Sequence, residues 1–172
     1  MNDIIGKFAV IIFGIPFVFY IAIAIIALKM DNMSQTYIDN AVVEFVDNAR
    51  ASARITPEAY ENMAYKISVA HSPCEIKIWH SAKYVNPGEE SDGRYDALTY
   101  NEDYGKEYIF SKMYPDNYTS KDYLLKEGDY IKVTVQNETP TLGARLAGIL
   151  LPGYNKNSLF TSYGGYVGND TQ

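Results

Sequence analysis

The sequence predicts an α+β protein in which a long N-terminal helix carries a small head, made of one packed helix and an antiparallel sheet. Three observations indicate this arrangement. An apolar run of 21 residues, 8–28, lies near the N-terminus of the 172-residue chain. A segment with helical periodicity follows it without a break, and short segments of alternating polarity occur later in the chain.

The apolar run 8–28 has the length of a membrane-spanning helix. About 20 apolar residues in a helix rise roughly 30 Å, the thickness of the bilayer hydrocarbon. A secretory signal has a shorter apolar region of about 7–15 residues, followed by a small-residue cleavage site. The pattern Ala22-Ile23-Ala24 instead lies inside the run. We expect an uncleaved transmembrane helix, with a cytoplasmic leader at residues 1–7 and the rest of the chain outside the cytoplasm.

Gly14 and Pro16 interrupt the apolar run. In membrane helices these residue types allow a kink or the close approach of a neighbouring helix. They are also commoner in membrane helices than in soluble ones, without any packing role. Both positions are candidate assembly residues.

Residues 29–54 predict an amphipathic stem that continues the membrane helix. Apolar residues recur three or four positions apart, and Gly and Pro are absent between Phe17 and Thr56. The whole helix would be about 70 Å long at 1.5 Å per residue. Its apolar stripe would pack against the head or against neighbouring subunits. The stripe positions assigned to assembly are Met30, Met33, Tyr37, Ala41, Val42, Phe45 and Ala49.

The head, residues 55–172, begins with a second helix. Thr56 is a suitable N-cap, Pro57 suits the first helical position and Glu58 the first turn. This helix is expected to end near Ala70, before Ser72-Pro73.

Strands and one short helix are expected in the rest of the head. Residues 74–80 and 130–136 alternate in polarity, and residues 159–167 form a last strand with a bend or bulge at Gly164-Gly165. Residues 108–113 are assigned to a further strand and residues 86–106 to a loop. The apolar segment 141–151 predicts a helix, which at 11 residues is too short to span a bilayer.

Composition excludes several classes of function. From Met30 onward there are 13 Lys and Arg residues against 20 Asp and Glu, so the head repels nucleic-acid phosphates. Cys74 is the single cysteine, which excludes an intramolecular disulfide and a Cys-rich metal site. The 16 tyrosines, many of them in residues 95–130, could contact proteins or sugars, or simply form a packed surface.

No catalytic, cofactor or metal site is assigned from the sequence. Cys74 and His80 lie six residues apart on one strand, about 20 Å, too far to form a nucleophile–base pair. The acidic segments 89–96 and 116–122 lack EF-hand spacing and read as solvated loops. We therefore expect a protein that is not an enzyme and has no cofactor.

The order of these elements resembles that of type IV pilins, pseudopilins and the TadE-like minor pseudopilins of bacterial tight-adherence pilus systems. The stretches that carry the resemblance are residues 8–54, VEFVDNARASARITPEAYENMAYKI, YIKVTVQNETPTLGARLAGILLPGY and SLFTSYGGYV. The family's processing site is a Gly followed by an apolar run with Glu at its fifth position. Here Gly6 precedes the run, but its fifth position is Ile11.

The resemblance implies a pilin-like, lollipop-shaped subunit of a cell-surface filament or of its assembly machine. Its expected partners are the membrane and further copies of itself or other pilin-like subunits. The expected location is the cell membrane, with the head outside the cytoplasm, or the filament itself. The alternative is a single-span anchor that displays a Tyr-rich acidic head for binding or adhesion.

Overall fold

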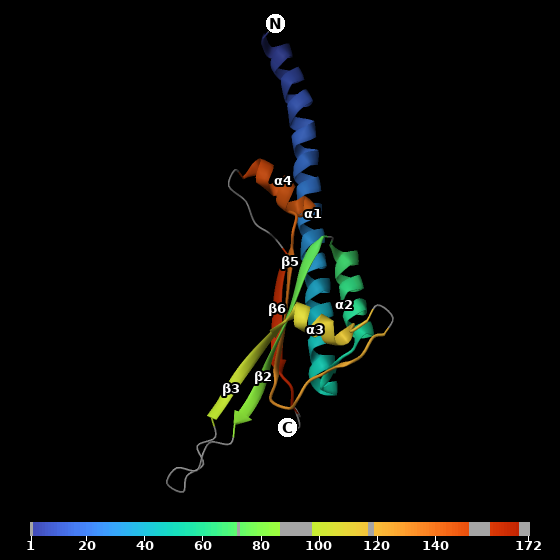
Figure 1. The fold of residues 1–172 in the computed structure, drawn as a ribbon. Coiled ribbons are helices and arrows are strands. Elements are labelled where there is room, and N and C mark those ends of the chain that lie inside the picture. Colours follow the sequence, from blue (N-terminus) through green and yellow to red (C-terminus); the bar gives the residue numbers. More distant parts are fainter. Residues whose placement is uncertain (1, 72, 87–97, 117–118, 152–158, 169–172) are drawn as a thin grey trace.

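The computed structural model describes every residue except 1, 72, 87–97, 117–118, 152–158 and 169–172. The fold is α+β, with a long N-terminal helix and an antiparallel sheet (Figure 1). The elements are α1 (Asn2–Ser52), β1 (Arg54–Ile55), α2 (Pro57–Ala70), β2 (Cys74–Asn86), β3 (Leu98–Gly105), α3 (Lys106–Met113), β4 (Tyr123–Leu124), β5 (Tyr130–Asn137), α4 (Leu142–Leu150) and β6 (Phe160–Tyr166).

The main sheet has four strands in the order β3-β2-β5-β6, and every neighbouring pair is antiparallel. β1 and β4 form a separate two-stranded pair. In β5, the side chains of Ile131, Val133 and Val135 face the core, and the intervening residues are half-buried on the other face. This alternation is the pattern expected of a sheet with one covered face.

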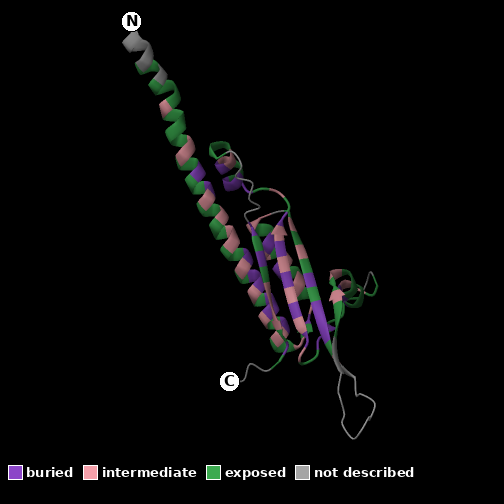
Figure 2. Cartoon of the chain, turned by 90° about the vertical axis from the view of Figure 1, so that its left-hand side faces the viewer, coloured by how far each residue is buried: buried purple, intermediate pink, exposed green. Residues whose placement is uncertain are grey.

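Helix α1 has two different halves. Its N-terminal half is mostly exposed and projects beyond the head, whereas its C-terminal half lies against β5, β6 and α2 (Figures 1 and 2). The helix continues through Pro16 without a break. The prediction of one continuous helix to about residue 54 is thus confirmed.

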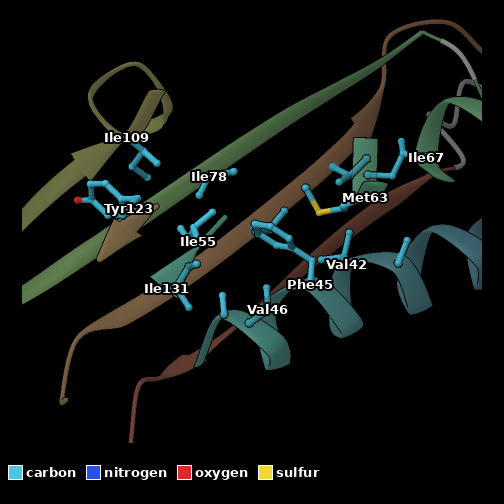
Figure 3. Close-up of a cluster of buried hydrophobic side chains, with 14 of the residues drawn as sticks. Val42, Phe45, Val46, Ile55, Met63, Ile67, Ile78, Ile109, Tyr123 and Ile131 are labelled. Atoms are coloured by element: carbon cyan, nitrogen blue, oxygen red, sulfur yellow. The ribbon is translucent and has the colours of Figure 1, made fainter. Parts of the chain in front are cut away.

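The core of the head lies between α1 and the covered face of the sheet. Val42, Phe45 and Val46 point from α1 toward the strands, where they meet Ile78 and Ile131 (Figure 3). Helix α2 contributes Met63 and Ile67 to the same cluster, and α3 contributes Ile109 and Met113. The C-terminal half of α1 is therefore part of the hydrophobic core of the head.

Several predicted elements are confirmed. Helix α2 begins after Thr56, whose hydroxyl accepts a 3.1 Å hydrogen bond from the backbone N–H of Ala59. Strand β2 places Ile78 on the core side and Glu75 and Lys77 in solvent, as the alternation predicted. The short apolar helix and the last strand correspond to α4 and β6.

The assignment of residues 108–113 to a strand was wrong, because they belong to helix α3. Ile109 and Met113, four residues apart, share the buried face of this helix. In the predicted loop 86–106, residues 98–105 form β3, whose pairing with β2 compensates for a polar sequence with weak strand propensity. The acidic positions 89–96 lie outside the described residues.

The expectation of a bend or bulge at Gly164-Gly165 was also wrong. Both residues pair with β5 in regular register, Gly164 with Lys132 and Gly165 with Ile131. A Cβ atom on Gly165 would lie 2.6 Å from the Nε atom of Arg50. Gly165 instead makes room for the stem helix.

Candidate functional sites on the stem and in the head

The N-terminal half of α1 is the candidate membrane segment. Among the described residues, α1 is the one helix long and apolar enough to cross a membrane. Phe13, Val18 and Phe19, like most large side chains of this half, are more than half exposed. Up to Phe19, this part of the chain therefore presents apolar side chains on all sides, as a helix in lipid or in a filament core does.

The structure divides the candidate assembly residues into two groups. Met30, Met33 and Tyr37 are exposed on α1 just beyond the apolar run, and Met33 is 72% exposed. Gly14 and Pro16 lie further toward the N-terminus, on the projecting half of the helix. The remaining positions are buried in the core of the head: Ala41, Val42, Phe45 and Ala49. The head thus covers the side of α1 that carries these four residues, whereas Met30, Met33 and Tyr37 lie on a side that it leaves open.

A polar seam joins α1 to the edge strand β6, beside the buried stripe. The amide of Gln35 binds both backbone groups of Phe160: its Oε1 accepts from the N–H at 3.1 Å and its Nε2 donates to the carbonyl at 3.1 Å. The same Nε2 lies 2.8 Å from the hydroxyl of Thr161, which donates to the carboxylate of Asp39. The seam therefore covers the backbone of an otherwise open sheet edge.

The seam continues to the far end of the stem. The Nε of Arg50 donates to the carbonyl of Tyr166 at 2.8 Å, and Arg50 also pairs with Asp47 at 3.1 Å. The hydroxyl of Tyr163 donates to the same Asp47 carboxylate at 3.2 Å. Polar residues of α1 outside the apolar stripe thus hold the last strand at both ends.

A buried polar network lies in the head around His80. Its Nε2 is 3.0 Å from an Oδ2 atom of Asp129, and its Nδ1 is 2.8 Å from the hydroxyl of Tyr123. Asp129 also accepts the backbone N–H groups of Lys83 at 3.0 Å and Lys126 at 2.7 Å. Since a carboxylate only accepts, the Nε2 carries a proton, and in the neutral imidazole the Tyr123 hydroxyl donates to Nδ1.

Tyrosines form a pocket of about 280 Å³ beside this network. Tyr104 stacks on His80 at 5.7 Å between ring centroids and on Tyr108 at 4.3 Å. The ammonium of Lys126 lies 5.6 Å from the ring centroid of Tyr84, and Lys112 lies over Tyr108. The full lining comprises His80, Ala82, Lys83, Tyr84, Tyr104, Tyr108, Lys112, Asp122, Tyr123, Leu124, Lys126 and Asp129.

Burial and hydrogen bonding keep the pocket tyrosines protonated. Burial raises the pKa of Tyr123 well above its usual value, with smaller contributions from neighbouring groups such as Asp129. The hydrogen bond to Tyr84 raises the pKa of Tyr104 in the same direction. Both rings therefore present neutral hydroxyl groups at physiological pH.

The network around His80 is suited to holding the head together. Both imidazole nitrogens are occupied, one by Asp129 and one by Tyr123, and the side chain is buried. A general base needs a nitrogen within reach of a substrate proton. Cys74 lies six residues away on the same strand, and its thiol contacts the carbonyl of His71 at 3.3 Å instead. Burial raises the pKa of this thiol, which disfavours the nucleophilic thiolate.

A second aromatic group lies on the uncovered face of the sheet. Trp79 packs edge-on against Tyr130 at 6.4 Å between centroids, and Tyr130 against Tyr166 at 5.0 Å. These rings line a shallow hollow of about 250 Å³ together with Ser81 and Asn101. Rings on an open sheet face offer flat apolar surfaces with polar rims, as sites for sugars or peptides do.

Sequence reasoning missed the residues that connect distant elements. The helical period places Gln35 and Asp39 outside the apolar stripe, but it does not indicate that they bind β6. The Gly128-Asp129 pair before a strand signals a turn, which the structure contains, with Gly128 at a φ of 87°. Nothing in the sequence connects this turn to His80, 49 positions earlier. Within the described residues, no group of three His, Cys, Asp or Glu side chains could hold a metal ion.

Comparison of the chain with family models, with curated proteins and with solved structures found no match.

Proposed function

We propose that this protein is a membrane-anchored, pilin-like structural subunit of a cell-surface filament or of its assembly machine. The observation that carries the proposal is that the two halves of helix α1 differ in their surroundings. One half is an exposed apolar rod, and the other half is built into the core of the head. With this arrangement, a subunit can first be anchored in the membrane by its apolar helix. The same helix can then pack against the helices of other subunits in a filament core.

The exposed patch Met30, Met33 and Tyr37 supports this proposal. These side chains lie just beyond the apolar run, where a stem leaves the bilayer, and each is about half exposed or more. Apolar side chains at this height can pack against the stem of a neighbouring copy. The neighbouring copy is thus the proposed occupant of the patch.

The first test is the location and intact mass of the protein in cells that express it. Sheared surface fibres and membranes are separated, and the chain is identified in each by mass spectrometry. Recovery in fibres of high molecular mass would support the filament subunit, and the mass would show whether the residues up to Gly6 are removed. Full-length protein confined to the membranes would instead favour an anchored head.

The second test places a charge on the exposed patch. Met33→Asp should abolish assembly and leave membrane insertion intact, because Met33 contacts no part of the head core. Asn32→Asp adds the same charge to a neighbouring exposed position and should assemble normally. Phe45→Asp and Val42→Asp are unsuitable for this purpose, since both residues are buried and the charge would unfold the head. If the Met33→Asp variant forms normal fibres, the exposed patch is not a contact between subunits.

The alternative function is a membrane-tethered binding head, and the two aromatic surfaces around Tyr104 and Trp79 favour it. Here the span serves only as a tether. Replacing residues 8–28 with an unrelated Leu/Ala helix should then preserve binding of cells to a surface. Under the filament proposal, the same replacement should abolish fibres.

A further inference from the structure

Helix α4 packs against a part of α1 that lies within the apolar run. Ala24 and Ala27 of α1 are buried there, as are Gly143, Ala144 and Ala147 of α4. A Cβ atom on Gly143 would lie 3.0 Å from the carbonyl carbon of Ala27 and would collide with the carboxylate of Asp31. Small residues that let two helix backbones approach closely are typical of helix pairs in membranes.

A hydrogen bond deep in the apolar run connects the same two helices. The hydroxyl of Tyr20 donates to the backbone carbonyl of Leu146 at 2.6 Å. Tyr20 lies eight residues before Leu28, about 12 Å from the head-side end of the run at 1.5 Å per residue. A hydroxyl at this depth in lipid needs a protein partner, because no water is available. Helix α4 provides that partner.

The start of α4 is polar and lies nearer the head. Thr141 caps the helix by accepting the backbone N–H of Ala144 at 3.1 Å, and its hydroxyl donates to Asp31. Asp31 is three residues beyond the end of the apolar run. Helix α4 therefore begins at the height of the lipid headgroups and runs from Asp31 toward Tyr20, that is, toward the bilayer.

The remaining face of α4 is apolar and exposed. Its large side chains are Leu142, Ile149, Leu150 and the C-cap Leu151, and Ile149 is 69% exposed. On α1, Ile23, Ile25 and Ile26 are exposed at the same height. Arg145 is the one charged residue of α4, and its long side chain can reach the headgroup layer. The outer face of α4 is thus continuous with the proposed membrane span.

We propose that α4 is a second membrane-embedded element, which enters the head-side leaflet beside the stem and exposes its outer face to lipid acyl chains. The proposal rests on the proposed membrane anchoring of α1. It explains why a nine-residue helix exposes so many large apolar side chains. It also holds the head directly at the membrane surface, because α4 comes between β5 and β6 in the order of elements.

The test measures lipid contact at three positions in the full-length protein. Single cysteines replace Ile149 in α4, Ile15 in the span and Val69 in α2, in a Cys74→Ala background. Each carries an environment-sensitive fluorophore, and the protein is reconstituted in phosphatidylcholine vesicles in large lipid excess. All three native side chains are more than half exposed. Quenching is measured with lipids that carry a nitroxide on the acyl chain.

We expect strong quenching at positions 15 and 149 and none at position 69. Quenching at position 15 with none at position 149 would overturn the proposal for α4 and leave the anchor intact. That result would also be obtained if a second copy covered the outer face of α4. Absence of quenching at both positions would overturn the membrane anchor, and the α4 proposal with it.

Discussion

Phe45 illustrates how a single side chain of the stem stabilises the head. It is 4% exposed and packs in the core shared by α1, α2 and the sheet. Tyr37 and Met33 are exposed, because they lie about 80° and about 120° around the helix from Phe45. Ile38, the residue after Tyr37, is 1% exposed, so the head covers one side of the helix at this height and leaves the other side open.

We predict that Phe45→Ala lowers the free energy of unfolding by about 3–5 kcal/mol, through lost burial and a cavity. The matched control is Phe160→Ala, whose side chain is 57% exposed. This control should change stability by only about 0.5 kcal/mol. Both values can be measured by denaturant titration in detergent, followed by the fluorescence of Trp79, the single tryptophan. Equal effects of the two substitutions would contradict the placement of Phe45.

Tyr123 is expected to make the head less stable at alkaline pH. Burial raises its pKa in the folded state, so the unfolded chain loses the phenolic proton first as pH rises. Folding stability must therefore fall as pH rises above about 10, the ordinary pKa of tyrosine. Below that pH, the favourable contribution of the protonated phenol is fully present.

We predict that Tyr123→Phe makes this alkaline decline shallower, by up to about 1.4 kcal/mol per pH unit. At neutral pH the variant should be less stable by about 1 kcal/mol, because the hydrogen bond to His80 is lost. Tyr65→Phe, at an exposed position, should keep the wild-type slope. Unfolding free energies measured between pH 8 and pH 11 test this. An unchanged slope in Tyr123→Phe would contradict it.

At the scale of elements, the attachment of β6 to α1 explains how one sheet edge is protected. Free edge strands present unpaired backbone groups that invite association with other chains. Gln35 occupies both backbone groups of Phe160, much as a neighbouring strand would. The stem helix thus closes the edge that β6 would otherwise leave open.

We predict that Gln35→Ala speeds hydrogen exchange at the Phe160 amide and lowers stability by about 1–2 kcal/mol. Asn40→Ala removes an exposed amide from the same helix and should leave the exchange of Phe160 unchanged. Exchange can be followed by mass spectrometry of peptides from β6. Equal protection of Phe160 in both variants would show that Gln35 does not hold the edge.

Prediction from sequence succeeded for elements with a strong local pattern and failed for the others. The cap at Thr56 and the alternation in β2 and β5 are local signals, and each element begins where it was expected. β2 continues six residues beyond the expected strand 74–80, to Asn86, because it pairs with β3 there. Helix α3 and strand β3 are short, polar and rich in tyrosine, so their local propensity was weak. Packing of Ile109 on the core and pairing of β3 with β2 determined their conformation.

At the scale of the whole molecule, α1 consists of three successive segments that make different contacts. Its first residues project freely, the middle from Tyr20 to Asp31 carries α4, and the remainder supports the head. Because these contacts follow one another along the helix, the chain can be shortened stepwise from its N-terminus.

We predict that deleting residues 2–18 leaves both α4 and the head core intact, since Tyr20 and Ala24 remain. Deleting residues 2–30 should expose α4 to rapid hydrogen exchange, while β5 keeps its protection. Both variants are to be compared in the same detergent. Equal protection of α4 in the two variants would contradict its docking on this part of the stem.

The sequence by itself determined the long helix, its apolar length, the cap at Thr56 and the core strands. These features depend on residues a few positions apart, whose periodicity can be read directly. Only the tertiary structure decided which residues of the stripe the head covers, which groups His80 binds, and where α4 docks. The bonds His80–Asp129 and Tyr20–Leu146 join residues 49 and 126 positions apart. Such pairings arise when the folded chain brings distant elements together, and no local pattern encodes them.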